Sequence, residues 1–226
     1  MERIRVLTTN LWGVNVDATG FADSLRYLDP DIVCAQELAP TAAAVLEDLY
    51  PHGELYPETD FRGMGIALRN PGKLSSIEMA QKNALVAVLE PDDWPTLNEV
   101  LEIVNLHFAA PGPRRIPSQL RARRRQLAAF DQYLRDAPSR PRLLVGDLNS
   151  TPLWPLYRRM TAQFTDAHRE IARQFRRAPR RTWGPTHSWP RLLRIDHVLT
   201  RGVQISDLWV VPIPGSDHSG VVFDLA

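Results

Sequence analysis

Polar side chains that can bind metals or transfer protons follow directly after several apolar segments of this sequence. The set comprises Asn10, Glu37, His107, Asp147, Asn149, Asp196, His197, Asp217 and His218. A single Asn or Asp at such a position is usually a turn residue. Glu37 is harder to explain in this way, because it follows an apolar run, and buried carboxylates are rare unless they are paired or bound to a metal. The repeated pattern therefore predicts a site built from strand ends.

These residue types indicate hydrolysis by a metal-activated water. Carboxylate and amide oxygens suit Mg²⁺, Mn²⁺ or Ca²⁺, whereas the HxxxH, HExxH and CxxC spacings of a dedicated zinc site do not occur. The histidines fit better as phosphate ligands or proton carriers, and an adjacent Asp would favour a charged ring. GxSxG, GxxxxGK(S/T) and GxGxxG are also missing, so neither a nucleophilic serine nor a phosphate-binding loop is indicated.

Alternation, breakers and turn signals predict the elements that must position these residues. Strands are predicted at residues 3–9, 31–36, 65–68, 75–79, 84–90, 99–106, 142–145, 194–200, 205–212 and 220–225. Helices are predicted at 21–28, 40–49, 118–135 and 154–160, loops at 51–63 and 111–117, and residues 166–190 show no clear pattern. The helix at 118–135 would bury Leu120, Leu127, Phe130 and Leu134 and expose its arginines. Strands interrupted by helices indicate a mixed sheet core with helices outside.

Six motifs together identify a family resemblance. TTNLWG, AQEL, NLHFAAPG, GDLNSTP, RIDHVLT and GSDHSGVV occur in this order between residues 8 and 222. Their combination resembles the endonuclease/exonuclease/phosphatase superfamily, the DNase I-like metal-dependent phosphoesterases. The resemblance implies an α/β fold, a four-layered sandwich of two packed mixed β-sheets flanked by helices. It also implies that residues 1–226 form one domain.

The resemblance implies a set of metal ligands. Glu37 resembles the principal ligand, with Asn10 beside it and Asp217 as a further ligand, for one or two Mg²⁺ or Mn²⁺ ions or for Ca²⁺. Two positions depart from the common pattern. Trp12 stands where repair endonucleases have an Asp, which argues against that branch, and His197 stands where many members have Tyr or Arg. His197 lies opposite to Asp196 in the strand register, so we expect it to be structural.

The resemblance also implies catalytic roles. Asp147 and Asn149 resemble the residues that orient the attacking water and hold the scissile phosphate. His218 resembles the histidine that contacts the phosphate or carries protons, and Asp196 resembles the carboxylate that orients it. His107 resembles a phosphate-contacting histidine of DNase-like and sphingomyelinase-like members. We therefore predict a phosphodiester hydrolase of the nuclease type, with a phosphatase or phosphodiesterase acting on a small-molecule or lipid ester as the alternative. A non-catalytic phosphate-binding scaffold is the remote alternative.

Two arginine-rich stretches and an aromatic segment are candidates for substrate binding. The arginines are Arg114, Arg115, Arg121, Arg123, Arg124 and Arg125, followed by Arg173, Arg176, Arg177, Arg180 and Arg181. They could grip a nucleic-acid backbone or a multiply phosphorylated head group, or they could form a solvated face. Trp183, His187 and Trp189 could stack on a base or sugar, touch a lipid, or pack under a loop. Arg114, Arg115, Trp183 and His187 are the specific candidates for contacts with the phosphate-ester substrate, and nucleic acid is one partner that they would allow.

Bulk properties set the remaining expectations. The chain has 226 residues and a formal net charge of +1, and only Lys73 and Lys82 of its 27 basic residues are lysines. No apolar run reaches the roughly 18 residues of a membrane span. The single cysteine, Cys34, lies in an apolar segment and is expected to be an inert core thiol. We expect a cytoplasmic monomer, unless a leader peptide has been removed.

Overall fold

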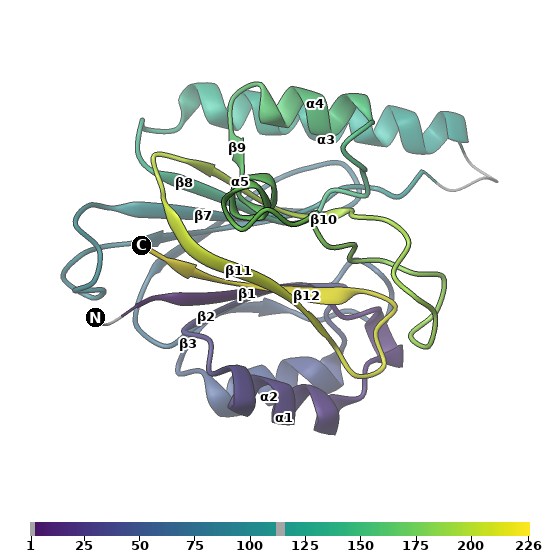
Figure 1. Ribbon diagram of the computed structural model, residues 1–226, viewed down its shortest axis with the longest axis horizontal. Coiled ribbons are helices and arrows are strands. Elements are labelled where there is room, and N and C mark those ends of the chain that lie inside the picture. The colour runs from purple at the N-terminus through teal and green to yellow at the C-terminus, as the bar shows by residue number, and fades with distance from the viewer. Residues whose placement is uncertain (1–2, 112–115) are drawn as a thin grey trace.

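Two six-stranded β-sheets packed face to face form the centre of the computed structural model, which describes residues 3–111 and 116–226 (Figure 1). The first sheet has the order β11-β12-β1-β2-β4-β3, with β11 Ile205–Pro212, β12 Ser219–Leu225, β1 Arg5–Asn10, β2 Ile32–Gln36, β4 Met64–Leu68 and β3 His52–Tyr56. The second has the order β5-β6-β7-β8-β10-β9, with β5 Lys73–Ile77, β6 Ala84–Leu89, β7 Leu101–His107, β8 Arg142–Asp147, β10 Asp196–Arg201 and β9 Thr165–Asp166. Each sheet contains one parallel pair, β1 with β2 and β7 with β8, so both sheets are mixed.

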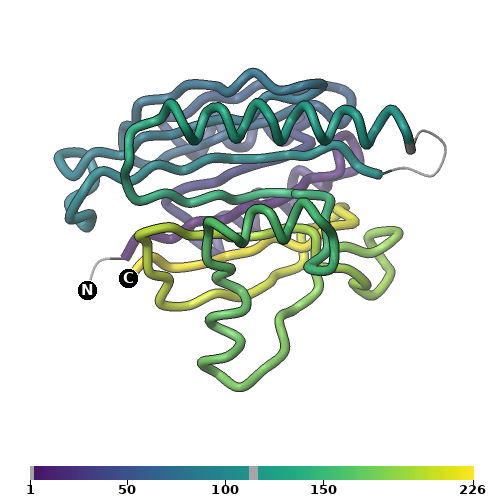
Figure 2. Tube along the Cα trace, turned by 90° about the horizontal axis from the view of Figure 1, so that it is seen from above, coloured from purple at the N-terminus to yellow at the C-terminus, as the bar shows by residue number. Residues whose placement is uncertain are grey.

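Helices cover the outer faces of both sheets (Figure 1). The helices α1 Ala18–Leu28 and α2 Pro40–Leu49 pack on the first sheet, and α3 Ile116–Asp136 and α4 Pro155–Thr161 pack on the second. The helix α5 Ala167–Gln174 lies beside β10 and β11, and a short 3₁₀ turn spans Gly13–Asn15. The view from above shows α3 running along the length of the second sheet (Figure 2). The predicted four-layered DNase I-like sandwich is therefore confirmed.

The central strands are apolar on both faces because both faces are covered. Ile32 and Cys34 of β2 face the core between the sheets, whereas Val33 and Ala35 face the helices α1 and α2. A continuous apolar run is the expected sequence for a strand in this position. Cys34 is fully buried, and burial raises the pKa of its thiol, which agrees with the predicted inert thiol.

The strand β3 and the helix α5 both fall where the sequence predicted no regular element. Residues 51–63 were predicted to be a loop but contain the edge strand β3, whose residues are exposed or only partly buried and therefore show no apolar alternation. Its ladder with β4 defines it as a strand. In the unassigned stretch 166–190, α5 is capped by Asp166, which accepts a hydrogen bond from the Arg169 amide. Only Ala167, Ile171 and Ala172 supply its apolar face, too few for a clear period.

The long helix α3 corrects two details of the prediction. Leu127, Phe130 and Leu134 pack against the second sheet, but Leu120 is 45% exposed, so it does not share their buried face. Arg123 is buried, and it donates hydrogen bonds to the carbonyl oxygens of Ala109 at 2.6 Å and Leu148 at 3.3 Å. The prediction of a wholly solvated arginine face was therefore wrong at Arg123, because this side chain ties α3 to two loops beside the strand ends.

Candidate active site

Sheet topology brings the predicted site residues together at one edge of the molecule. The parallel register pairs His107 at the end of β7 with Asp147 at the end of β8, and the antiparallel register pairs Asp196 with Asp147. In the facing sheet, Asn10 ends β1 and Glu37 follows β2. A cleft of about 380 Å³ at this edge is lined by Glu37, His107, Asp147, Asn149, Trp183, Asp217 and His218. Residues up to 181 positions apart in sequence thus share one cleft, as the sequence predicted.

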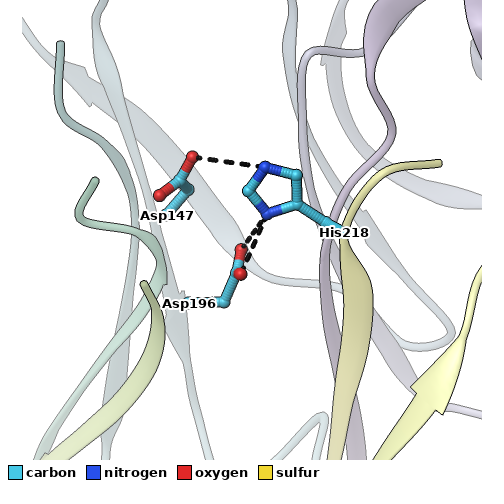
Figure 3. Close-up of side chains that lie close together, drawn as sticks. All are labelled: Asp147, Asp196 and His218. Atoms are coloured by element: carbon cyan, nitrogen blue, oxygen red, sulfur yellow. Dashed lines mark hydrogen bonds and ion pairs between the residues drawn. The ribbon is translucent and has the colours of Figure 1, made fainter. Parts of the chain in front are cut away.

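His218 and Asp196 form the hydrogen-bonded pair predicted from the RIDH and SDH motifs (Figure 3). The His218 Nδ1–H donates to both carboxylate oxygens of Asp196, at 3.0 and 2.9 Å. Burial alone would lower the pKa of His218, but the charges of Asp196, Asp147 and Asp217 and the hydrogen bond outweigh it and raise the pKa to about 9. The ring is therefore charged at neutral pH, with Nε2 directed toward Asp147, whose Oδ2 lies 3.9 Å away.

Asp147 is a fully buried carboxylate held by amide donors. Its Oδ1 accepts a 2.7 Å hydrogen bond from the Asn149 backbone N–H, and its Oδ2 accepts from Nδ2 of Asn149 at 2.9 Å and of Asn10 at 3.1 Å. Burial and the negative charge of Asp196 raise the pKa of Asp147 to about 7. Gly146 precedes it with φ +121°, and a Cβ there would lie 2.1 Å from the Leu106 carbonyl oxygen, so only glycine lets β8 approach β7 this closely.

Glu37 and Asp217 present carboxylate oxygens suited to a hard cation. Glu37 Oε1 accepts a 3.1 Å hydrogen bond from Asn10 Nδ2, whereas its Oε2 is buried and has no hydrogen-bond partner among the described residues. Asp217 shows the same division, since Oδ2 accepts from Trp183 Nε1 at 3.0 Å and the buried Oδ1 has no such partner within the described part of the chain. Unpaired buried carboxylate oxygens are costly, so the donor set fits Mg²⁺ or Mn²⁺. Burial raises the pKa of both carboxyl groups.

Asn10 lies between two carboxylates. Its Nδ2 donates to Glu37 and Asp147, and its Oδ1 accepts a 3.0 Å hydrogen bond from the Trp12 backbone N–H. Metal ligation by Asn10 would use the second lone pair of Oδ1 and stays a prediction.

A second group of residues could also hold a metal ion. Ligand atoms of Asp147, Asp196 and His218 lie within 4.8 Å of one another, and all three residues are buried. However, Asp196 already engages Nδ1 of His218, and a charged imidazole offers no lone pair to a metal. Glu37 and Asp217 are therefore the better candidate ligands.

Lys82 is a residue of this cleft that the sequence analysis missed. It lines the cleft, and its Nζ lies 2.9 Å from Nδ1 and 2.6 Å from Nε2 of His107. Burial lowers the pKa of Lys82 to about 8, although the charges of Glu37 and Asp147 oppose the shift. Burial and the Lys82 charge hold the pKa of His107 well below its ordinary value, so this ring is neutral. The one available signal was the rarity of lysine in an arginine-rich chain.

The remaining candidates differ in their positions. Trp183 lines the cleft, whereas His187 is exposed and does not line it. Arg114 and Arg115 lie outside the described residues. His197 is buried behind the site, where its Nε2 lies 2.7 Å from the Ser150 carbonyl oxygen, consistent with the structural role expected for it. Apart from the buried Arg123, the other arginines of the two stretches are exposed, and one of them, Arg177, donates a 3.0 Å hydrogen bond to the Leu208 carbonyl oxygen.

Comparisons with known proteins agree with this fold. The model of the Endonuclease/Exonuclease/phosphatase family matches residues 7–218, and the chain belongs to this family. Members of this family are generally enzymes that hydrolyse phosphoesters, typically with a divalent metal. No curated protein matches the chain. None of the described helices is long and apolar enough to cross a membrane.

Several solved structures share the fold at low sequence identity. An endonuclease/exonuclease/phosphatase from Bacteroides vulgatus is 18% identical, with a TM-score of 0.76, over 100% of this chain and 99% of that one. The human Nocturnin catalytic domain with bound sulfate is 17% identical, with a TM-score of 0.73, over 99% and 94%. D. rerio TDP2 complexed with a single strand DNA product is 18% identical, with a TM-score of 0.71, over 100% of both chains.

Proposed function

We propose that this protein is a divalent-metal-dependent phosphodiesterase of the nuclease type, which cleaves its substrate by in-line attack of water. The observation that carries the proposal is the cleft itself. It combines the buried Asp147, the charged pair of His218 with Asp196, and carboxylate oxygens of Glu37 and Asp217 that accept no hydrogen bond from the described residues. Together these groups supply a base, a cation and a metal-binding face within one site.

In-line hydrolysis builds negative charge on the phosphoryl oxygens and the leaving oxygen. A Mg²⁺ or Mn²⁺ ion bound by Glu37 and Asp217 would supply positive charge against that negative charge. Asp147 would align and deprotonate the attacking water. The backbone N–H and the side-chain amide of Asn149 hold its carboxylate in position. His218, kept charged by Asp196, would bind a phosphoryl oxygen.

The preference for a nucleic-acid phosphodiester rests on two supports. One structural relative, D. rerio TDP2, is described with a single strand DNA product. In addition, Arg121 and Arg125 are exposed on α3 and line a pocket with Gln81, which also lines the catalytic cleft. Arginine forks match phosphate geometry, so this pocket suits a neighbouring phosphate of a polynucleotide.

A substrate panel tests the proposal. Plasmid DNA, single-stranded DNA, RNA, a sphingomyelin-type lipid, inositol phosphates and bis(p-nitrophenyl) phosphate would each be incubated with Mg²⁺ or Mn²⁺. We expect cleavage of DNA or RNA and of the aryl phosphodiester, loss of activity with chelator, and loss in Asp147→Asn. Cleavage of the lipid or inositol phosphates alone would replace the nuclease assignment. Failure of every substrate in both metals would instead favour a phosphate-binding scaffold.

A further inference from the structure

Lys82 lies in the catalytic cleft and is held there by His107. Both ring nitrogens of His107 are within 2.9 Å of the Lys82 Nζ, and both side chains line the cleft that contains Asp147 and His218. An ammonium group can only donate hydrogen bonds. The acceptor in His107 is therefore the ring nitrogen that lacks a proton.

Two further N–H donors of Lys82 are left over. An ammonium carries three donors, and His107 is its only hydrogen-bonded partner among the residues that the structure describes. A cation that is partly withdrawn from water is stabilised when its donors meet an anionic or polar acceptor. The free donors of Lys82 therefore suit an anion that enters the cleft.

The turn that carries Lys82 has an unusual backbone conformation and a hydrogen bond across it. Gln81, the residue before it, has φ +73°, in the left-handed region that residues other than glycine seldom adopt. The Asn83 side-chain oxygen accepts a 3.3 Å hydrogen bond from the Met79 backbone N–H across the turn. Such conformations cluster at functional sites, where the surrounding structure holds them. Gln81 lines the cleft together with Lys82, so the residue with the positive φ and the ammonium group lie on the same side of the cleft in sequence-adjacent positions.

The two histidines of the cleft flank Asp147 but differ in their partners. Nε2 of His107 lies 3.7 Å, and Nε2 of His218 3.9 Å, from Asp147 Oδ2. His218 is paired with the carboxylate of Asp196, whereas His107 is paired with an ammonium group. A phosphate that approaches Asp147 would thus meet a charged imidazole on one side and Lys82 on the other.

We propose that Lys82 binds a non-bridging oxygen of the scissile phosphate and that His107 is the positioning residue for Lys82. The inference rests on the proposed phosphoester hydrolysis and adds a substrate-binding residue to it. It also reassigns His107, which the family resemblance implied to be a phosphate ligand, to an indirect role.

Kinetics on Lys82→Met, Lys82→Arg and the control Lys73→Met test the proposal. Lys73 is the only other lysine of the chain, and it is an exposed β5 residue paired with Glu90. With bis(p-nitrophenyl) phosphate, we expect Lys82→Met to raise KM about 10- to 100-fold, the size of a lost charged hydrogen bond. Lys82→Arg should recover most of the affinity, and Lys73→Met should match the wild type. His107→Phe alone should also raise KM. Combined with Lys82→Met, it should raise KM no further than Lys82→Met does alone.

Binding of inorganic phosphate, measured by calorimetry at fixed Mg²⁺, separates this proposal from the proposed function. We expect Lys82→Met to weaken phosphate binding by a similar factor, whether or not any ester is hydrolysed.

Unchanged phosphate affinity and KM in a folded Lys82→Met would overturn the role of Lys82. The proposal would also fail if that variant altered only the Mg²⁺ affinity, or if the wild type bound no phosphate. A His107→Phe effect that persists in Lys82→Met would overturn the positioning role. Circular dichroism confirms folding, and Lys82→Arg provides the charged comparison if Lys82→Met does not fold.

Discussion

The indole of Trp183 holds the carboxylate of Asp217, since its Nε1–H donates a 3.0 Å hydrogen bond to Oδ2. Trp183 also forms an isolated β-bridge to His218, so the aromatic segment before the RIDH motif is tied to the SDH motif at the cleft. Oδ1 of Asp217 accepts no hydrogen bond from the described residues and lies 3.9 Å from Nε2 of His218. Trp183 thereby orients a candidate metal ligand in addition to lining the cleft.

Trp183→Phe should therefore weaken metal binding. The ring remains, but the donor that fixes Asp217 is lost, and removal of such an outer-shell partner typically costs about 10- to 100-fold in metal affinity or activity. Activity titrated with Mn²⁺ should show a higher half-saturating concentration and a nearly normal rate at saturation. Trp189→Phe is the matched control, since Trp189 is 57% exposed and does not line the cleft. Equal metal dependence in both variants would contradict this role for Trp183.

Glu37→Gln should weaken metal binding and activity together. The amide keeps the size of the side chain but removes the negative charge and one ligand oxygen from a buried position. Because the substitution neutralises a largely buried carboxylate, the folded protein should lose no stability. Calorimetric Mn²⁺ titration and thermal melting provide the two measurements. Normal turnover at low Mn²⁺ would show that Glu37 is not the main ligand.

His218→Ala and Asp196→Asn should lower turnover more than metal affinity. His218→Ala removes the cation proposed to contact the phosphate, so kcat should fall by roughly 10²- to 10³-fold. Asp196→Asn leaves the ring but removes the charge that keeps it protonated, so a smaller loss is expected. His52→Ala, at an exposed histidine of β3, is the control. A near-normal kcat in His218→Ala would exclude the proposed contact.

Much of the cleft could be predicted from the sequence, because the family resemblance of the motifs implied which groups act together and a mixed sheet aligns the strand ends at which the motifs lie. Asp196 and His218 are 22 residues apart, yet their pairing followed from two short motifs. Lys82 could not be predicted in the same way. It lies in a turn between β5 and β6, and its position depends on the backbone of Gln81 and on His107, 25 residues away.

The missed elements share a physical cause, which is that tertiary contacts define them. The strand β3 has one neighbour, β4, and little apolar surface of its own. The helix α5 is short, and it is fixed by the Asp166 cap and by packing on β10 and β11. Asp166 also forms a buried salt bridge with Arg194, at 2.7 Å. Arg194, the first residue of the RIDH motif, is therefore structural. Local sequence patterns do not contain information about such long-range partners, so they could not predict these elements.

His168 should make the stability of the fold depend on pH. This α5 histidine is buried, and neither ring nitrogen has a hydrogen-bond partner among the described residues. Burial, with the positive charge of Arg194, lowers its pKa from 6.5 to about 3. Above pH 6.5 the ring is neutral in both the folded and unfolded states, so its contribution to stability is complete. As the pH falls from about 6.5 toward 3, the unfolded chain takes up a proton that the folded protein excludes, and stability is lost.

His168→Leu should therefore flatten this dependence. The leucine leaves no buried donor or acceptor without a partner, so the free energy of unfolding at pH 7 should be equal to or higher than that of the wild type. Between pH 6 and 4 the wild type should lose up to about 1.4 kcal/mol per pH unit more than the variant. Urea denaturation at each pH measures both curves, with His52→Leu as the exposed control, which should run parallel to the wild type. His197, whose pKa burial lowers to about 4, remains in all three proteins and leaves the difference unaffected. Parallel curves for wild type and His168→Leu would mean that His168 is protonated equally in the folded and unfolded states, contrary to its burial.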